Sequence, residues 1–335
     1  MKLHKFASIA VGVSLLTTSL FPATVTVAQS APFESESEIP RYSPELAMLQ
    51  KQLAASGMTN VGIARAEYIT TAAGFDPATS QTIIANDRQP LFSSPQFVEN
   101  DPRRGGRSSL TYVVDQSDGG AFTWTGTGLV LLPNSATEPV VDKSMATWHL
   151  DTHCNGPAAE KIIDSGGNID VFDDVVFGRP PGTPTADITH GGWISSRFFE
   201  WFQPGGSRLI LAITISFIFL DESGNPTDID QNGHADTAFV ESYYNRLFAW
   251  APSGNQDNLA IESIATHESG HAFGLDHFGR IFLTKNGPTD DEIHYAPRAV
   301  MNAVYVSPFP ELTGTDRSSF CRIWANSRCV TRDLE

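Results

Sequence analysis

Three histidines and a glutamate lie close together in the C-terminal half of the chain. Glu268 directly follows His267, His271 comes four residues after His267, and His277 comes six residues after that. On a helix, residues at i and i+4 project from one face, so the first two imidazoles can reach one ion at about 2.0–2.1 Å. Three neutral imidazoles leave a fourth position on zinc for water. The spacing therefore predicts a catalytic rather than a purely structural zinc site.

The residues between the histidines fit the same chemistry. Gly274 stands where the chain must leave the helix sharply, and glycine adopts the left-handed conformation that such an exit requires. The turn would return His277 to the ion. Zinc lowers the pKa of a bound water to about 7, and Glu268 could then accept its proton as general base. A surface helix that is merely rich in histidine is the alternative, but chance rarely produces the full pattern.

Residues 267–277 read His-Glu-Ser-Gly-His-Ala-Phe-Gly-Leu-Asp-His and match HExxHxxGxxH at every fixed position. This segment resembles the metzincin clan of zinc peptidases. The resemblance implies that Met301 lies in a turn beneath the metal and supports the site without binding the ion. Within the clan, Gly274–His277 and Leu312–Asp316 look most like matrixins. The resemblance covers about residues 105–325 and implies a zinc-dependent endopeptidase.

The first residues predict export. Lys2 and Lys5 precede an apolar stretch from Phe6 to Leu20, and small residues follow near residue 28. This order is typical of a signal peptide, here residues 1–28, although an uncleaved membrane anchor is the alternative. We therefore expect a protein secreted to the extracellular space or the periplasm, with no membrane partner after cleavage.

Residues 29–104 predict a separate N-terminal region, with a helix from Ser43 to about Ala55 followed by turn-rich sequence. A domain boundary is expected near residue 105, and residues 105–335 would form the zinc metallopeptidase domain. The matrixin propeptide blocks zinc with a cysteine, but no cysteine occurs between residues 29 and 153. Two hypotheses stand: an inhibitory propeptide removed near Arg103–Arg104, or a permanent accessory segment.

Strand-like and helical segments alternate irregularly in the rest of the chain, which favours an α+β fold. Leu209–Leu220 and Ala238–Trp250 predict strands, and Ala260–Phe273 predicts a helix closed by glycine. A further helix is expected across Ser144–Ile163, interrupted at residues 155–157. The family resemblance implies a metzincin-like catalytic domain, with a twisted mixed β-sheet above the active-site helix and a smaller C-terminal subdomain below. An extended peptide would bind between them, along an edge strand of the sheet.

A second cation site is suggested by an acidic loop. Oxygen-bearing side chains occupy loop positions 1, 3, 5 and 9 with glycine at position 6, namely Asp228, Asp230, Asn232 and Asp236. This spacing is close to a calcium loop, but position 12 holds Phe239 instead of the closing glutamate. The alternatives are a small Ca²⁺ site and an ordinary polar turn that enters the next strand.

The three cysteines are Cys154, Cys321 and Cys329, so one remains unpaired within the chain if a disulfide forms. A bridge between Cys321 and Cys329 would close a short loop. A bridge between Cys154 and Cys321 would constrain far more of the chain, and we favour it for that reason.

The overall charge narrows the class of partner. The chain of 335 residues carries a formal net charge of −16, which argues against binding to nucleic acid. A peptide or protein substrate is the partner that the zinc motif predicts. The rival hypothesis is a non-catalytic secreted protein that binds peptides and is stabilised by zinc or calcium. Glu268 counts against this rival, because a structural zinc site has no use for a carboxylate beside its first ligand.

Overall fold

The computed structural model describes residues 44–71, 94–115, 120–151, 154, 156–285 and 291–324. These residues belong to one compact unit, Tyr42–Glu335. The predicted signal peptide and Cys329 lie outside the described residues. Within the described part of the chain, no helix combines the length and the apolar character needed to cross a bilayer.

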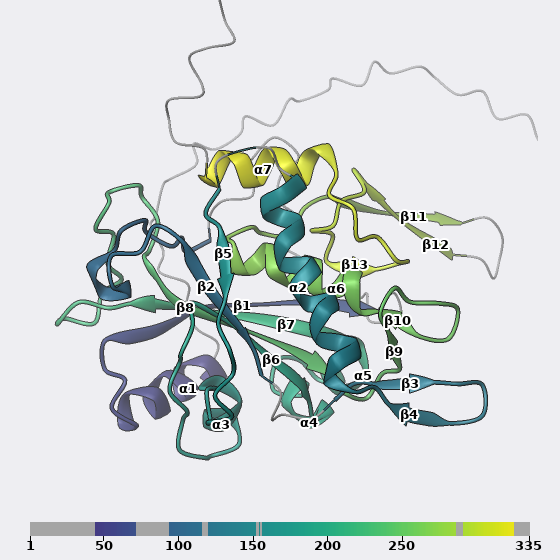
Figure 1. Cartoon of the computed structure of the whole chain (residues 1–335), viewed down its shortest axis with the longest axis horizontal. Coiled ribbons are helices and arrows are strands. Elements are labelled where there is room, and N and C mark those ends of the chain that lie inside the picture. The colour runs from purple at the N-terminus through teal and green to yellow at the C-terminus, as the bar shows by residue number, and fades with distance from the viewer. Residues whose placement is uncertain are drawn as a thin grey trace, which may run out of the picture. The chain divides into compact units, whose positions relative to one another are not determined.

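A seven-stranded mixed sheet forms the centre of the fold (Figure 1). Its only antiparallel pairings are those of β7 with β1 and with β8, and the other neighbours run parallel. In spatial order the strands are β13 (Val304–Tyr305), β1 (Val61–Thr71), β7 (Ile210–Phe219), β8 (Thr237–Asn245), β6 (Ile188–Ile194), β2 (Leu110–Val114) and β5 (Ala159–Lys161). The predicted α+β class with a central mixed sheet is therefore confirmed.

Helices cover both faces of this sheet (Figure 1). On one side lie α2 (Asn134–Asp151), α6 (Ile261–Ala272) and α7 (Gly314–Trp324), and on the other lie α1 (Pro44–Ala55) and α3 (Phe172–Val176). Trp148 of α2 donates a hydrogen bond from Nε1 to the Thr266 carbonyl of α6 at 2.8 Å. This contact joins the two longest helices on the side that carries the histidine motif.

The smaller elements lie around this framework. They are the 3₁₀ turn η2 (Pro102–Arg104), the helices α4 (Ser196–Phe199) and α5 (Gly206–Leu209), and the short strands β3 (Phe122–Trp124), β4 (Leu129–Leu131), β9 (Trp250–Ala251), β10 (Leu259–Ala260), β11 (Arg280–Lys285) and β12 (Asp291–Ala296). Of these, β3 with β4 and β11 with β12 form antiparallel pairs.

Two apolar cores hold the sheet and the helices together. The core on the α6 side includes Trp148, Phe273 and Phe320, while the core on the other side is rich in phenylalanine, including Phe172 and Phe217. β7 lies between the two cores and is buried along almost its whole length. Burial on both faces explains why its sequence is continuously apolar rather than alternating.

Most predicted elements are confirmed, with one correction after α2. The helix expected across Ser144–Ile163 ends at Asp151, and Ala159–Lys161 forms strand β5 instead. Gly156 and Pro157 separate the two elements, and proline cannot continue a hydrogen-bonded helix. β5 pairs in parallel with β2 and forms one edge of the sheet.

The N-terminal region contributes a strand that the sequence did not predict. β1 lies inside the same sheet as the strands that follow residue 105, between β7 and β13. The described part of residues 29–104 is therefore built into one unit with the rest of the chain, and no separate compact unit begins near residue 105. Arg103 and Arg104 are also held within this unit, since Arg104 is buried and pairs with Asp187 at 2.8 Å.

The favoured disulfide is confirmed. Cys154 and Cys321 are bonded, with their Cα atoms 5.5 Å apart and a sequence separation of 167. The bridge fastens the chain just after α2 to the last described helix, α7.

Candidate metal centre

Helix α6 and the turn after it position the three histidines. His267 and His271 lie one turn apart on α6, which ends at Ala272. Gly274 then adopts a left-handed φ of +89°, and its amide donates to the His271 carbonyl at 2.9 Å. A Cβ at Gly274 would lie only 3.2 Å from the Pro95 carbonyl oxygen, so both space and conformation favour glycine. The turn delivers His277 to the other two histidines, as predicted.

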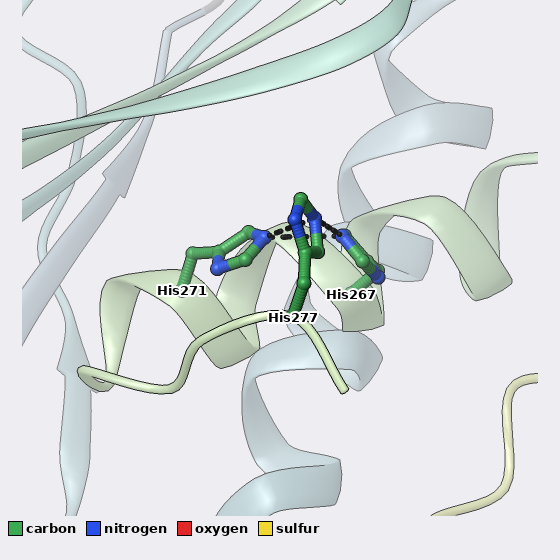
Figure 2. Close-up of side chains that lie close together, drawn as sticks. All are labelled: His267, His271 and His277. Carbon is green, nitrogen blue, oxygen red and sulfur yellow. Dashed lines mark hydrogen bonds between the residues drawn. The ribbon is translucent and has the colours of Figure 1, made fainter. Parts of the chain in front are cut away.

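The three Nε2 atoms converge on one point (Figure 2). They lie 3.1 Å, 3.1 Å and 3.2 Å from one another, and the three rings are buried. Ligand nitrogens about 2.0–2.1 Å from a tetrahedral zinc would be separated by about 3.3 Å. The spacing of His267, His271 and His277 therefore fits a single zinc ion.

The hydrogen bonds at Nδ1 determine which ring nitrogen carries the proton in His267 and His271. Nδ1 of His267 lies 2.7 Å from the Val300 carbonyl, and Nδ1 of His271 lies 2.8 Å from the Leu275 carbonyl. A carbonyl only accepts hydrogen bonds, so each Nδ1 carries the proton and each Nε2 of the neutral ring presents a lone pair. The Nε2 atoms of these two rings, 3.1 Å apart, cannot then hydrogen-bond to each other. Convergent lone pairs instead favour a cation between them.

Burial favours the neutral, ligating form of His267 and His277. Burial, together with the nearby His271, lowers the pKa of His267 to about 3, and the pKa of His277 lies well below its ordinary value for the same reasons. Burial also lowers the pKa of His271, but the Glu67 carboxylate more than offsets this and the net shift is upward. Neutral imidazole is the form that binds metal.

Glu268 lies beside the first ligand and is held by the sheet. Its Oε2 accepts a hydrogen bond of 2.6 Å from Thr214 Oγ1 on β7, and the residue has no exposed surface. Burial raises the pKa of Glu268 to about 8. A divalent cation in the adjacent histidine site would favour the ionised carboxylate. Glu268 directly follows the first histidine on α6, so it is the candidate proton acceptor for a water at the ion.

Met301 packs beneath the helix that carries the ligands. A Cβ at Gly270 would clash with Met301 Sδ and with the Trp148 ring, so the methionine fills the space that this glycine leaves. Asp316 fixes the turn, because its carboxylate accepts from the amides of Val300 at 3.0 Å and Met301 at 3.3 Å. The methionine therefore supports the α6 turn between the first two ligands.

β1 adds residues to the site that sequence reasoning missed. Glu67 Oε2 lies 2.8 Å from His271 Nδ1, and Glu67 Oε1 lies 4.0 Å from His277 Nδ1. Arg65 pairs with both Glu67 and Asp276, the residue just before His277. The available signal was a stretch of alternating β-prone residues, 61–71, with charges at two inward positions.

Comparison with protein-family models and with curated proteins finds no match to this chain. The three histidines can hold one metal ion, and the buried Glu268 directly follows the first of them in sequence.

The structure brings together three of the four residues of the predicted calcium loop. The carboxylates of Asp228, Asp230 and Asp236 lie within 4.8 Å of one another, but the Asn232 side chain bonds to Gln96 and Asp230. Asp236 is buried and pairs with Arg103 at 2.8 Å, so a guanidinium already neutralises one member of the cluster. Calcium at this loop stays a prediction.

Proposed function

We propose that this protein is a secreted zinc-dependent endopeptidase of the metzincin type, most similar to matrixins. The observation that carries the proposal is the convergence of the three buried Nε2 atoms, with the buried carboxylate of Glu268 directly after the first of these histidines on α6. His267, His271 and His277 would hold the zinc ion. When bound, the ion would polarise the scissile carbonyl and acidify the attacking water.

Glu268 would move the proton. It accepts a proton from the attacking water and passes it to the leaving amine, so hydrolysis needs no covalent intermediate. The hydrogen bond from Thr214 to Oε2 fixes the orientation of the carboxylate. Because this partner lies on β7, the proton acceptor is anchored to the central sheet and not only to α6.

Met301 and Asp316 support the metzincin assignment. The methionine turn lies under the ligand helix and is hydrogen-bonded from the start of α7, as a rigid floor for the site requires. In this assignment most of the sheet would lie on one side of the zinc site, and much of the chain after His277 would form the smaller subdomain on the other.

A non-catalytic peptide-binding protein is the second candidate. The observation that favours it is the burial of all three histidines and Glu268, whose exposed fractions lie between 0 and 6%. A structural zinc site needs no access for substrate, whereas a peptidase must open this site.

The test uses the full chain with zinc and an unfolded protein such as casein. We expect one zinc per chain, cleavage that a chelator abolishes, and loss of cleavage in Glu268→Gln with zinc retained. Glu262→Gln is the matched control, because Glu262 lies on the same helix but pairs with the exposed Lys143. A chain that binds no zinc would refute the proposal. One bound zinc without cleavage, even when Arg65 on β1 is replaced by alanine, would favour the peptide-binding protein.

A further inference from the structure

β1 lies directly across the metal centre. It pairs antiparallel with β7 from Val61 to Thr70 and parallel with β13 at Thr70 and Thr71. The edge of β7 nearest the histidines is therefore already occupied by a segment of the same chain. This corrects the expectation of a free edge strand beside the zinc site.

The two faces of β1 have different surroundings. Ala66 and Tyr68 pack against the phenylalanine-rich core on the far side of the sheet, while Ile69 packs into the core that surrounds α6. Arg65 and Glu67 share the Ile69 face and reach the histidine cluster and its loop. β1 thus presents a charged pair to the place where a substrate would need to approach the ion.

A polar network joins β1 to the ligand loop. Arg65 bonds to Asp276 and to Ser94, and Ser94 also donates to Asp276, whose neighbour in sequence is the third ligand, His277. Both register shifts of the β1–β7 pairing flank this part of the strand, at Ile63/Arg65 and at Ile69/Thr70. Such irregularities are common beside active sites and weaken the ladder on either side.

We propose that β1 occupies the substrate's place, so that the full chain is a largely latent form of the enzyme and is active only in the fraction of molecules from which β1 has left. This inference rests on the proposed function. The substrate is then an extended polypeptide that replaces β1, antiparallel to β7 and parallel to β13, and makes the main-chain hydrogen bonds that β1 makes here. Arg65 and Glu67 fasten the strand in the closed state. Access to the metal requires that β1 leave its position between the two neighbouring strands.

The experiment measures access to the ion without relying on catalysis. Zinc-loaded full chain is titrated with a fluorescent peptide hydroxamate, which binds zinc directly, in the wild type and in Arg65→Ala. Because apparent affinity scales with the fraction of open molecules, we expect Arg65→Ala to bind the probe about tenfold more tightly or better. Tyr68→Phe is the control, since it removes only the hydrogen bond to Gln203 on the opposite face of β1.

Hydrogen exchange gives the second measurement. Saturating probe should accelerate exchange of the β1 amides that pair with β7, while the β7 amides that pair with β8 keep their protection. This measurement on the wild type decides the question even if Arg65→Ala fails to fold. Equal affinity in the wild type and Arg65→Ala, with β1 still protected in the complex, would overturn the inference and make β1 a permanent strand.

The inference and the proposed function fail in different ways. Failure of the wild type and of Arg65→Ala to bind the probe, although each carries one zinc, would also overturn latency. Probe binding that displaces β1, combined with no cleavage of casein by Arg65→Ala, would support the occupied site but refute the peptidase.

Discussion

The carboxylate of Glu67 lies 2.8 Å from Nδ1 of His271, on the side of the ring opposite to the metal-facing Nε2. A carboxylate in this position holds the ring of a metal ligand in orientation and increases its basicity. β1 therefore acts on the metal centre chemically as well as covering it.

Replacing Glu67 by glutamine should weaken zinc binding. The uncharged amide leaves only the Leu275 carbonyl to polarise Nδ1 of His271, so we expect a loss of about tenfold in zinc affinity, as is usual for partners of ligating histidines. Competition with a chromophoric chelator measures it. Unchanged affinity would show that the carbonyl alone orients the ring.

Removal of zinc should destabilise the folded chain. Binding to the native state alone stabilises by about 2.7 kcal/mol at a free zinc concentration one hundred times the dissociation constant. Thermal unfolding with and without a chelator should therefore differ in the wild type and coincide in His277→Ala, which lacks one of the three ligands. A chelator effect that persists in His277→Ala would place the stabilising ion elsewhere, for instance at the acidic loop.

Asp316→Ala should destabilise the methionine turn. The side chain is fully buried and accepts from the amides of Val300, Met301 and Thr313, which the variant would leave without these acceptors. Each unsatisfied buried amide costs about 1–3 kcal/mol, so we expect a loss of at least about 2 kcal/mol in urea unfolding. The exposed Glu311 on the preceding loop supplies the control, Glu311→Ala, which should change stability little.

Acid should destabilise the protein in part through His190. Burial, with a smaller contribution from Lys161, lowers the pKa of His190 to about 3. The unfolded chain takes up this proton near pH 6.5, so stability is lost as pH falls from about 6.5 towards 3. In His190→Gln the slope should decrease by up to about 1.4 kcal/mol per pH unit, measured by urea unfolding across this range. The other buried histidines are common to both proteins, so an identical slope would count against this role for His190.

The sequence predicts the convergence of the three histidines because their geometry is local. His267 and His271 are placed by one helical turn, and Gly274 determines the exit that delivers His277. The contribution of Glu67 depends instead on the pairing of β1 with β7, whose register is a long-range property. The roles of Arg65 and Thr214 are not predictable from the sequence for the same reason, because both lie on strands distant in sequence from α6.

The boundaries of helices and strands are harder to predict from the sequence than their presence. The apolar β7 and the glycine-closed α6 are recognisable from their own residues, whereas the end of α2 and the start of β5 depend on pairing with β2. The link between Cys154 and Cys321 was favoured only because it constrains more of the chain, an argument about the unfolded state rather than about the fold.

The position of the disulfide determines which pieces of the chain would stay covalently linked after a break in the backbone. Cys154 and Cys321 join two elements that both follow β1, and the first 153 residues contain no cysteine. A break in the backbone between the bonded cysteines would leave both pieces covalently attached. A break between β1 and β2 would leave β1 held only by hydrogen bonds, ion pairs and packing. The bridge therefore retains the helices and strands around the metal as one molecule while leaving β1 free to dissociate.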